Sequence, residues 1–301
     1  MRLRTTLLAL AAACVLSATP AHADQTRAAF SFAVIGDAPY FAWEALRMER
    51  MLDTLNQADL AFILHVGDLK SGRDLCDDRV YEERLRLFQR SQHPFVLLPG
   101  DNDWTDCSRP SNGGYVPLER LAHFRAVFYP DRRSLGQRPM ALERQSDDPA
   151  FEPFRENMRW RVGGVLFAAA HVVGSGNDLG NPGYAERNRA NLAWLTQAFD
   201  LAAAAQVEGL VVAIHGDPLL ESRAGSPRRA GFDDFVQLLE QRAATLGKPV
   251  LLIHGDSHQY RWDRPRPSLQ RLESFGSPDV GWVRVTVQAG TPGLFSVEPY
   301  R

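Results

Sequence analysis

Short aliphatic segments that alternate with amphipathic segments constrain the fold of this chain more than any other sequence feature. The aliphatic segments end at Gly, Pro or His and cover residues 30–35, 60–64, 95–98, 165–170, 210–214 and 250–253. Their length and apolar character predict buried strands. Apolar residues recur every three or four positions between them, which predicts helices over residues 43–55, 79–89, 118–128, 189–204 and 232–246. Strands separated by helices predict an α/β fold whose sheet core is covered by helices.

Two further segments predict antiparallel strands at the sheet edges. Residues 159–172 have the pattern of a hairpin that turns at Gly163-Gly164, and residues 281–297 alternate apolar and polar side chains. The stretch 130–153 is polar and punctuated by proline, which is typical of a long surface excursion. Because no low-complexity linker interrupts the pattern, residues 24–301 are predicted to form a single domain.

The first 23 residues follow the pattern of a secretory signal peptide. Arg2 and Arg4 supply a positive start, residues 7–16 form a short apolar run, and Ala21-His22-Ala23 ends the segment with small residues. We expect cleavage before Asp24 and a periplasmic or secreted mature chain. A stable membrane span is not expected, because crossing a bilayer takes about 20 apolar residues.

Cysteine usage depends on this export prediction. A lipoprotein lipidated at Cys14 is an alternative, although the three alanines before Cys14 lack the usual leucine-like residue. Removal of the signal peptide leaves Cys76 and Cys107 in an oxidising compartment, where a disulfide between them is predicted. Two free thiols are the alternative, and a zinc site is disfavoured because neither cysteine belongs to a CxxC pair.

The charge balance excludes one class of partner. The net charge is -2, with 34 Lys and Arg against 36 Asp and Glu, so no general basic field attracts nucleic acid or an anionic membrane. Any anion must therefore be bound by local groups.

Gly-Asp dipeptides follow the predicted strands directly. One such dipeptide is usually a turn or a helix cap. Several at the carboxyl ends of strands predict carboxylates that converge in the ligand crevice of an open α/β sheet, together with His215 and His258. Because clustered carboxylates repel one another, cations are expected there. The five dipeptides are Gly36-Asp37, Gly67-Asp68, Gly100-Asp101, Gly216-Asp217 and Gly255-Asp256.

The order of these segments resembles the motif series of the calcineurin-like metallophosphoesterases across nearly the whole mature chain. That family has, in order, Asp-x-His, Gly-Asp, Gly-Asn-His-Asp/Glu, a lone His after a strand, and Gly-His-x-His. The segments here are Asp37-Ala38-Pro39, Gly67-Asp68, Gly100-Asp101-Asn102-Asp103, His215 and Gly255-Asp256-Ser257-His258. The resemblance implies a mixed β-sheet sandwich flanked by helices and a metal-dependent phosphoesterase activity.

Carried over residue by residue, the resemblance implies a set of metal ligands. Asp37 and His258 look like ligands of a first metal, Asp68 like the bridging carboxylate, and His215 like a ligand of a second metal. Asp101 and Asp256 stand where the family has Asn and His, and both can still coordinate a metal through oxygen. The resemblance also implies catalytic roles for Asn102, Asp103 and His215.

The metal identity follows from the ligand types. Four aspartates and two histidines form an oxygen-rich set, which favours Mn²⁺, Mg²⁺ or Ca²⁺ over zinc, with iron and zinc as alternatives. One or two divalent ions are expected.

Two positions depart from the family pattern in ways that affect chemistry. Pro39 replaces the first-motif histidine and cannot bind a metal. Its neighbour Tyr40 either lines the pocket or supplies a phenolate ligand. Asn102 replaces the histidine that protonates the leaving group, and an amide cannot donate that proton. Loss of general-acid help typically costs about 100- to 10,000-fold in rate, so substrates with good leaving groups are favoured.

Residues just beyond the second and third motifs are candidates for substrate binding. Lys70, Arg73 and Arg109 can hold a phosphate together with Asn102, or they are solvated loop cations. The expected substrate is a phosphorylated small molecule or a nucleotide-like compound. The other strand-end histidines, His65, His171 and His254, are predicted to be hydrogen-bonding groups rather than ligands.

Three functions compete on these grounds. The first is an exported metal-dependent phosphoesterase acting on monoesters or diesters. The second is a metal- or anion-binding protein that keeps the fold and has lost turnover, as Pro39 and Asn102 suggest. The third is a GDSL-like serine esterase, because Gly255-Asp256-Ser257 resembles the nucleophile block of that family, with His258 as base.

Overall fold

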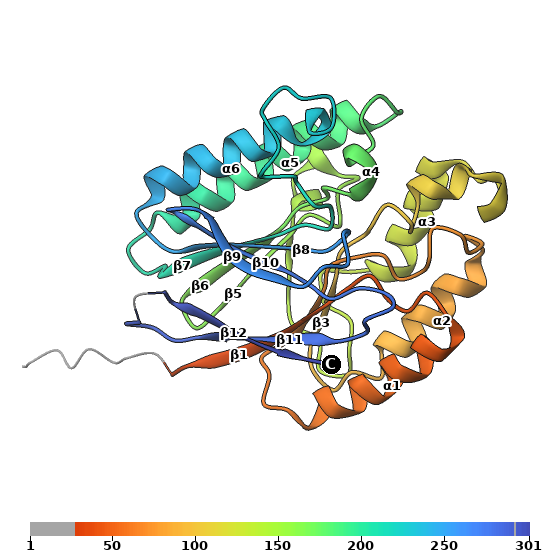
Figure 1. Cartoon of the computed structure of the whole chain (residues 1–301), viewed down its shortest axis with the longest axis horizontal. Helices are drawn as coiled ribbons and strands as arrows, with labels where there is room; N and C mark the ends of the chain where they lie inside the picture. The colour runs from red at the N-terminus through yellow and green to blue at the C-terminus, as the bar shows by residue number, and fades with distance from the viewer. Residues whose placement is uncertain (1–27, 292) are drawn as a thin grey trace, which may run out of the picture.

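Two β-sheets pack face to face between two layers of helices (Figure 1). The computed structural model describes residues 28–291 and 293–301. The predicted signal peptide, residues 1–23, and its cleavage site lie outside this range. The predicted class, α/β with a mixed sheet sandwich flanked by helices, is confirmed.

The first sheet contains the three strands that begin the chain's alternating pattern. β1, β2 and β3 are parallel and joined through α1 and α2, while β11 and β12 add antiparallel neighbours beside β1. The spatial order is β12-β11-β1-β2-β3. The bounds are β1 (Phe30–Ile35), α1 (Ala42–Gln57), β2 (Ile63–His65), α2 (Asp78–Phe88), β3 (Phe95–Leu97), β11 (Trp282–Val287) and β12 (Phe295–Tyr300).

The second sheet repeats this arrangement with the later strands. β6, β7 and β8 are parallel and connected by α5 and α6, and β10 lies parallel to β8. The order is β4-β5-β6-β7-β8-β10-β9, with antiparallel strands at both edges. The bounds are β4 (Glu143–Arg144), β5 (Met158–Val162), β6 (Val165–Ala169), α5 (Tyr184–Ala202), β7 (Gly209–Ala213), α6 (Asp233–Leu246), β8 (Val250–His254), β9 (Arg261–Arg266) and β10 (Leu269–Glu273).

The remaining helices lie in the connections between strands. They are α3 (Pro117–Phe128), α4 (Gly174–Asn177) and the 3₁₀ helices η1 (Thr105–Ser108), η2 (Pro110–Asn112), η3 (Gln145–Asp147), η4 (Pro149–Phe151) and η5 (Ala230–Phe232).

Both faces of the central strands are covered, which explains their continuous apolar sequences. Along β6, Val165 and Phe167 face the core between the sheets, whereas Leu166 and Ala168 face the core under α5 and α6. A strand buried on one face only would alternate apolar with polar residues. The four layers therefore follow from the strand sequences once the helices lie outside.

An aromatic cluster joins the two sheets at their interface. Phe32 and Phe62 stack with ring centroids 4.8 Å apart, and Phe167 of the opposite sheet meets Phe62 edge-on at 5.1 Å. Trp160 on β5 stacks on Phe167 at 5.3 Å. All four side chains are buried, so this cluster contributes a large part of the contact between the sheets.

Two regions differ from the sequence-based expectation. The stretch 130–153 is not only a surface excursion, because Leu135 bridges to Phe95 and β4 joins the edge of the second sheet. The hairpin of β9 and β10 has no counterpart among the predicted elements. Its buried strand β10 carries Arg271, which pairs with Asp263, so the apolar pattern that marks a buried strand is missing.

Among the described residues, no helix combines the length and the apolar character needed to cross a bilayer.

The aromatic cluster yields a stability prediction. Phe167→Ala should lower the free energy of unfolding by about 3–5 kcal/mol, because it removes a buried ring and leaves a cavity. Urea denaturation measures the loss. The matched control is Phe41→Ala, whose ring is 56% exposed and whose loss should stay within about 0.5 kcal/mol. Equal losses for the two variants would contradict the assigned role of the cluster.

Candidate metal centre

Four aspartates and one histidine from five strand ends converge on one point. Asp37, Asp68 and Asp101 follow β1, β2 and β3 of the first sheet, and His215 and Asp256 follow β7 and β8 of the second. Asp37, Asp68 and Asp256 have left-handed backbone angles, with φ of 51°, 57° and 76°. Aspartate tolerates this conformation better than most residues. The tight turns keep each carboxylate close to the end of its strand.

His215 lies at the centre of the carboxylates. Its Nε2 atom is 3.0 Å from Asp101 Oδ1, 3.4 Å from Asp68 Oδ1 and 3.9 Å from Asp256 Oδ1. Its Nδ1 atom lies 2.9 Å from the carbonyl oxygen of Val66. Once a cation compensates the carboxylates, a proton on Nδ1 donated to that carbonyl would leave the Nε2 lone pair for the metal, as a metal-binding imidazole requires.

Two groups of ligand atoms share this histidine. Asp37, Asp68 and His215 form one group, and Asp101, His215 and Asp256 form the other, each with its ligand atoms within 4.8 Å of one another. The grouping differs from the predicted one, because His258 belongs to neither. His258 Nε2 lies 3.6 Å from Asp37 Oδ1, at the margin of the first group, and its Nδ1 is 2.7 Å from the Ser277 carbonyl oxygen.

Burial makes this carboxylate cluster electrostatically costly. Burial raises the pKa of Asp37 to about 8 and raises the pKa values of Asp68 and Asp256. Burial would also raise the pKa of Asp101, but the hydrogen bond and charge of His215 lower it overall. Burial by itself would lower the pKa of His215, yet the surrounding carboxylates, Asp68 foremost, raise it well above its usual range.

The donor set fits divalent cations. Asp37 Oδ2 is buried and has no hydrogen-bond partner, although an ionised carboxylate oxygen in that position needs one. The raised pKa values show that these carboxylates cannot all ionise without added positive charge nearby. A divalent ion supplies that charge and accepts the orphaned oxygen as a ligand.

Tyr40 and Asn102 occupy the space beside Asp68. The Tyr40 hydroxyl donates to Asp68 Oδ2 at 2.9 Å and lies 3.3 Å from His258 Nε2. The Asn102 amide donates to Asp68 Oδ2 and, at 3.1 Å, to the Tyr40 hydroxyl. Burial and the charge of Asp68 raise the pKa of Tyr40 well above its usual range, so this phenol is a hydrogen-bond donor at the edge of the site.

Asp103 lies behind the site and holds two loops together. Its Oδ2 accepts hydrogen bonds from the backbone N–H groups of Gly100 at 2.7 Å and Asp68 at 3.1 Å, and its Oδ1 accepts one from Leu69 at 2.9 Å. The side chain is fully buried. This carboxylate therefore positions the two metal-binding loops, whereas the resemblance implied a catalytic role.

The three candidate phosphate-binding cations, Lys70, Arg73 and Arg109, lie in different environments. Lys70 is fully buried, and its Nζ donates to the carbonyl oxygens of Ser71 and Asp74. Arg109 pairs with Asp106 at 2.5 Å, and Arg73 is exposed on the loop. Lys70 and Arg109 are thus engaged by groups of their own loops, although the charges of Asp103 and Asp68 still act on Lys70.

Ser257 has a different partner from the one a serine esterase needs. Its hydroxyl donates to the buried carboxylate of Glu273. His258 directs Nδ1 at the Ser277 carbonyl and Nε2 toward Tyr40. With both ring nitrogens engaged elsewhere, His258 is not placed as a base for Ser257.

The contact of Ser175 with Asp101 was not predicted from the sequence, because Ser175 belongs to no recognised motif. Ser175, in the turn after β6, donates its hydroxyl to Asp101 Oδ2 at 2.6 Å. Ser175 follows the parallel strand β6, and a position after a parallel strand is also what located the other site residues.

The remaining strand-end histidines are hydrogen-bonding groups, as predicted. His65 Nε2 lies 3.2 Å from the Ala38 carbonyl oxygen, and burial lowers its pKa to about 3, so the ring is neutral. His171 Nδ1 is 2.7 Å from Glu156 Oε1, and His254 Nδ1 is 3.0 Å from the carbonyl oxygen of Gly255.

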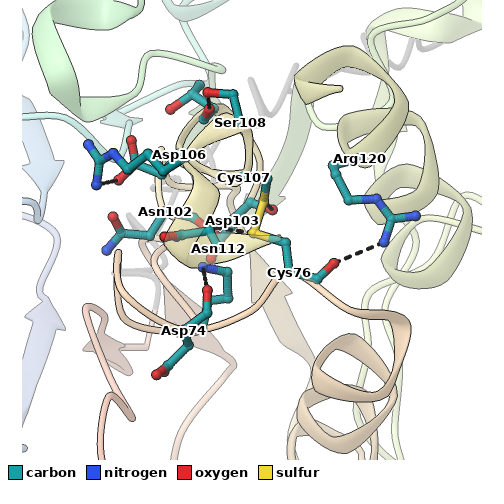
Figure 2. Close-up of a disulfide and its surroundings, with 12 residues drawn as sticks. Asp74, Cys76, Asn102, Asp103, Asp106, Cys107, Ser108, Asn112 and Arg120 are labelled. Atoms are coloured by element: carbon teal, nitrogen blue, oxygen red, sulfur yellow. Dashed lines mark hydrogen bonds and ion pairs between the residues drawn. A yellow bond between two sulfur atoms is a disulfide. The ribbon is translucent and has the colours of Figure 1, made fainter. Parts of the chain in front are cut away.

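The predicted disulfide between Cys76 and Cys107 is present and borders the site (Figure 2). Its Cα atoms are 5.6 Å apart. Figure 2 shows Asn102 and Asp103 next to the bridge, on the loop that follows β3. The bond therefore ties the loop beyond Asp68 to the loop beyond Asp101.

Comparisons with solved structures identify the fold. A dimetal phosphatase from Danio rerio superposes with a TM-score of 0.55 at 12% identity, over 90% of this chain and 98% of the other. Phosphopantetheinyl hydrolase from Mycobacterium tuberculosis superposes with a TM-score of 0.52 at 11% identity, over 89% and 95% of the two chains. The chain has the calcineurin-like metallophosphoesterase fold.

A purple acid phosphatase from yellow lupin (Lupinus luteus) shares the metallophosphoesterase fold, with a TM-score of 0.51 and 10% identity over 90% of this chain and 53% of the other. No family model and no curated protein sequence matches the chain. At these identities the likeness shows the fold alone. In this metallophosphoesterase fold the candidate metal groups lie at the strand ends of both sheets.

The disulfide should contribute to stability. Replacing both Cys76 and Cys107 by Ser should lower the free energy of unfolding by about 3–4 kcal/mol, because the bond closes a loop of 31 residues in the unfolded chain. Urea denaturation of the oxidised wild type and the double variant measures the difference. Reduced wild type should unfold like the variant, and a variant as stable as oxidised wild type would contradict the prediction.

Metal binding should stabilise the folded state. At about 100 times the dissociation constant, a bound ion should add about 2.7 kcal/mol to the free energy of unfolding. Thermal melts of chelator-stripped protein with added Mn²⁺ should show an upward shift that Asp68→Asn largely abolishes. A shift of equal size in that variant would show that the ion binds elsewhere.

Proposed function

We propose that this protein is an exported metal-dependent phosphoesterase. The observation that carries the proposal is the convergence of Asp37, Asp68, Asp101 and Asp256 on His215 at the strand ends of a metallophosphoesterase fold. Carboxylates and an imidazole at this density suit divalent ions that bind phosphoryl groups.

The ligand assignment follows the two groups. Asp37 and Asp68 would hold one ion, with His258 at its margin, and Asp101 and Asp256 would hold the other. His215 lies in both groups and Asp68 lies between them. When bound, divalent ions lower the pKa of a nucleophilic water and stabilise the negative charge that develops on the phosphoryl oxygens.

The chain's own donors would orient the substrate. Asn102 and Tyr40 place an amide N–H and a hydroxyl beside Asp68, where each can donate to a phosphoryl oxygen. Neither group is a proton donor of suitable pKa for a departing alkoxide. The geometry therefore favours phosphate esters whose leaving group departs without protonation, such as aryl esters.

Export belongs to the same proposal. The signal-peptide pattern of residues 1–23 predicts passage through a membrane, and the Cys76–Cys107 disulfide is typical of proteins in oxidising compartments. A periplasmic or secreted location is consistent with both features.

A second function is favoured by one specific feature. Pro39 and Asn102 replace histidines of the family motifs, and Asn102 instead donates to Asp68. A protein that binds metal and phosphate without turnover would retain this arrangement. The measurement of activity below separates the two functions.

The proposed activity predicts the behaviour of one ligand variant. Protein stripped with chelator and reloaded with Mn²⁺, Mg²⁺ or Ca²⁺ should hydrolyse 4-nitrophenyl phosphate. Asp68→Asn should lower kcat/KM by more than about 100-fold, because ion binding and charge stabilisation supply several kcal/mol to the transition state. Calorimetric titration with Mn²⁺ should show weaker binding in the same variant.

Asp217→Asn is the matched control. Asp217 also follows a strand in a Gly-Asp dipeptide, but its carboxylate accepts from the backbone N–H of Leu219 and belongs to neither metal group. Its activity should stay within about threefold of wild type. Metal binding without hydrolysis of monoester or diester would favour the binding protein, and hydrolysis that survives Asp68→Asn would overturn the metal centre.

A further inference from the structure

A pocket of about 300 Å³ lies between the loop that follows Asp101 and the loop that follows β6. Its apolar wall includes Val116 and Leu118, whose side chains are 61% and 42% exposed. Its polar groups belong to Thr105, Ser108, Asp178 and Asn181. The volume is at the lower end of the range for small-molecule sites.

The walls of this pocket are tied to the metal centre from both sides. The Thr105 hydroxyl donates to the carbonyl oxygen of Asp101 at 3.0 Å. On the other side of the pocket, Ser175 precedes the lining residue Asp178 by three positions and donates to Asp101 Oδ2. The candidate metal ligand Asp101 is therefore hydrogen-bonded to both loops that enclose the pocket.

The polar groups of the pocket are acceptors. The hydroxyl hydrogens of Thr105 and Ser108 are donated to the carbonyl oxygens of Asp101 and Thr105, so their lone pairs remain available. Asp178 is 7% exposed, and its Oδ1 accepts from the Asn181 amide at 2.6 Å. Within the described part of the chain, no cationic side chain lines the pocket. The guanidinium of Arg187 acts on Asp178 from a buried position outside the lining.

Two of the three candidate cations near the metal centre already have partners within their own loops. Lys70 is buried against loop carbonyls and Arg109 is paired with Asp106. A substrate with one phosphoryl group and no further negative charge is the best electrostatic match. Nucleotides with several phosphates and carboxylated phosphate esters match poorly.

We propose that this pocket receives the leaving group of the substrate, and that the substrate is a phosphate monoester of an apolar phenol carrying a hydrogen-bond donor such as an amine. The proposal rests on the phosphoesterase function proposed above. Val116 and Leu118 contact the apolar body, and Asp178 accepts from the donor or pairs with the cation. Hydrolysis breaks the bond between phosphorus and the leaving-group oxygen, and water supplies the oxygen and protons of the two products.

Three aryl phosphates of similar leaving-group chemistry test this specificity. They are 4-ethylphenyl phosphate, its 2-aminoethyl analogue (tyramine phosphate) and its 2-carboxyethyl analogue. The expected order of kcat/KM is amine, then ethyl, then carboxylate, with about tenfold or more between the extremes, since a charge beside a partly buried carboxylate is worth a pKa unit or more. The difference should lie mainly in KM.

Two variants locate the effect. Asp178→Asn keeps a residue that tolerates the left-handed φ of 56° and should bring the amine and carboxylate substrates to similar kcat/KM. Leu118→Ser should raise KM for 4-ethylphenyl phosphate about fivefold while leaving kcat within twofold. Both positions lie outside the metal groups. Controls are Asp59→Asn and Leu201→Ser, which are exposed and distant in sequence from the pocket walls.

These experiments distinguish failure of the proposed pocket from failure of the proposed phosphoesterase function. Hydrolysis of all three esters with equal kcat/KM, unchanged by the two variants, would overturn the pocket and leave the phosphoesterase function standing. If no ester is hydrolysed with any metal, the function fails and calorimetric titration with tyramine decides the pocket. Tyramine binding that is lost in Asp178→Asn and Leu118→Ser supports it, and equal or absent binding in all proteins overturns it.

Discussion

Mutual repulsion among buried carboxylates at the strand ends is the constraint on which the rest of this structure depends. Asp37, Asp68 and Asp101 are each at most 5% exposed, and they meet around a single imidazole. Such a cluster persists only if the backbone holds it and positive charge compensates it. Left-handed turns, the N–H groups that bind Asp103 and the Cys76–Cys107 bond supply the first condition. Divalent cations supply the second.

The same constraint explains how the site accommodates its unusual residues. Where the family has two histidines, this chain has Pro39 and Asn102, and the freed space beside Asp68 holds a Tyr40–Asn102 hydrogen bond. Neither Tyr40 nor Asn102 is an acid that could protonate a departing alkoxide. In the proposed phosphoesterase the rate would therefore depend on the leaving group, and the neighbouring pocket would influence the choice of substrate.

Much of the fold and the convergence of the candidate ligands could be predicted from the sequence, and the exceptions have physical causes. The parallel strands were recognisable because burial on both faces produces unbroken aliphatic runs, as in β6 and β8. β10 was not predicted, because it contains the charged residue Arg271. Arg271 is buried through its ion pair with Asp263, so the strand lacks the apolar pattern of a buried strand. The roles of Lys70 and Asp103 were left open by the sequence, because a charged side chain beside a motif can face either a ligand or the backbone of its own loop.

The sequence by itself determined which residues end each strand, and therefore that Asp37, Asp68, Asp101, His215 and Asp256 share one edge of the fold. This follows because apolar runs mark where the strands end, and the carboxyl ends of parallel strands joined by helices lie at one edge of a sheet. Only the tertiary structure decided that His215 is common to both metal groups, that His258 lies at the margin, and that Ser175 holds Asp101. The longest of these contacts joins Asp37 to His258, which lie far apart in the sequence, and no local sequence pattern encodes such a contact.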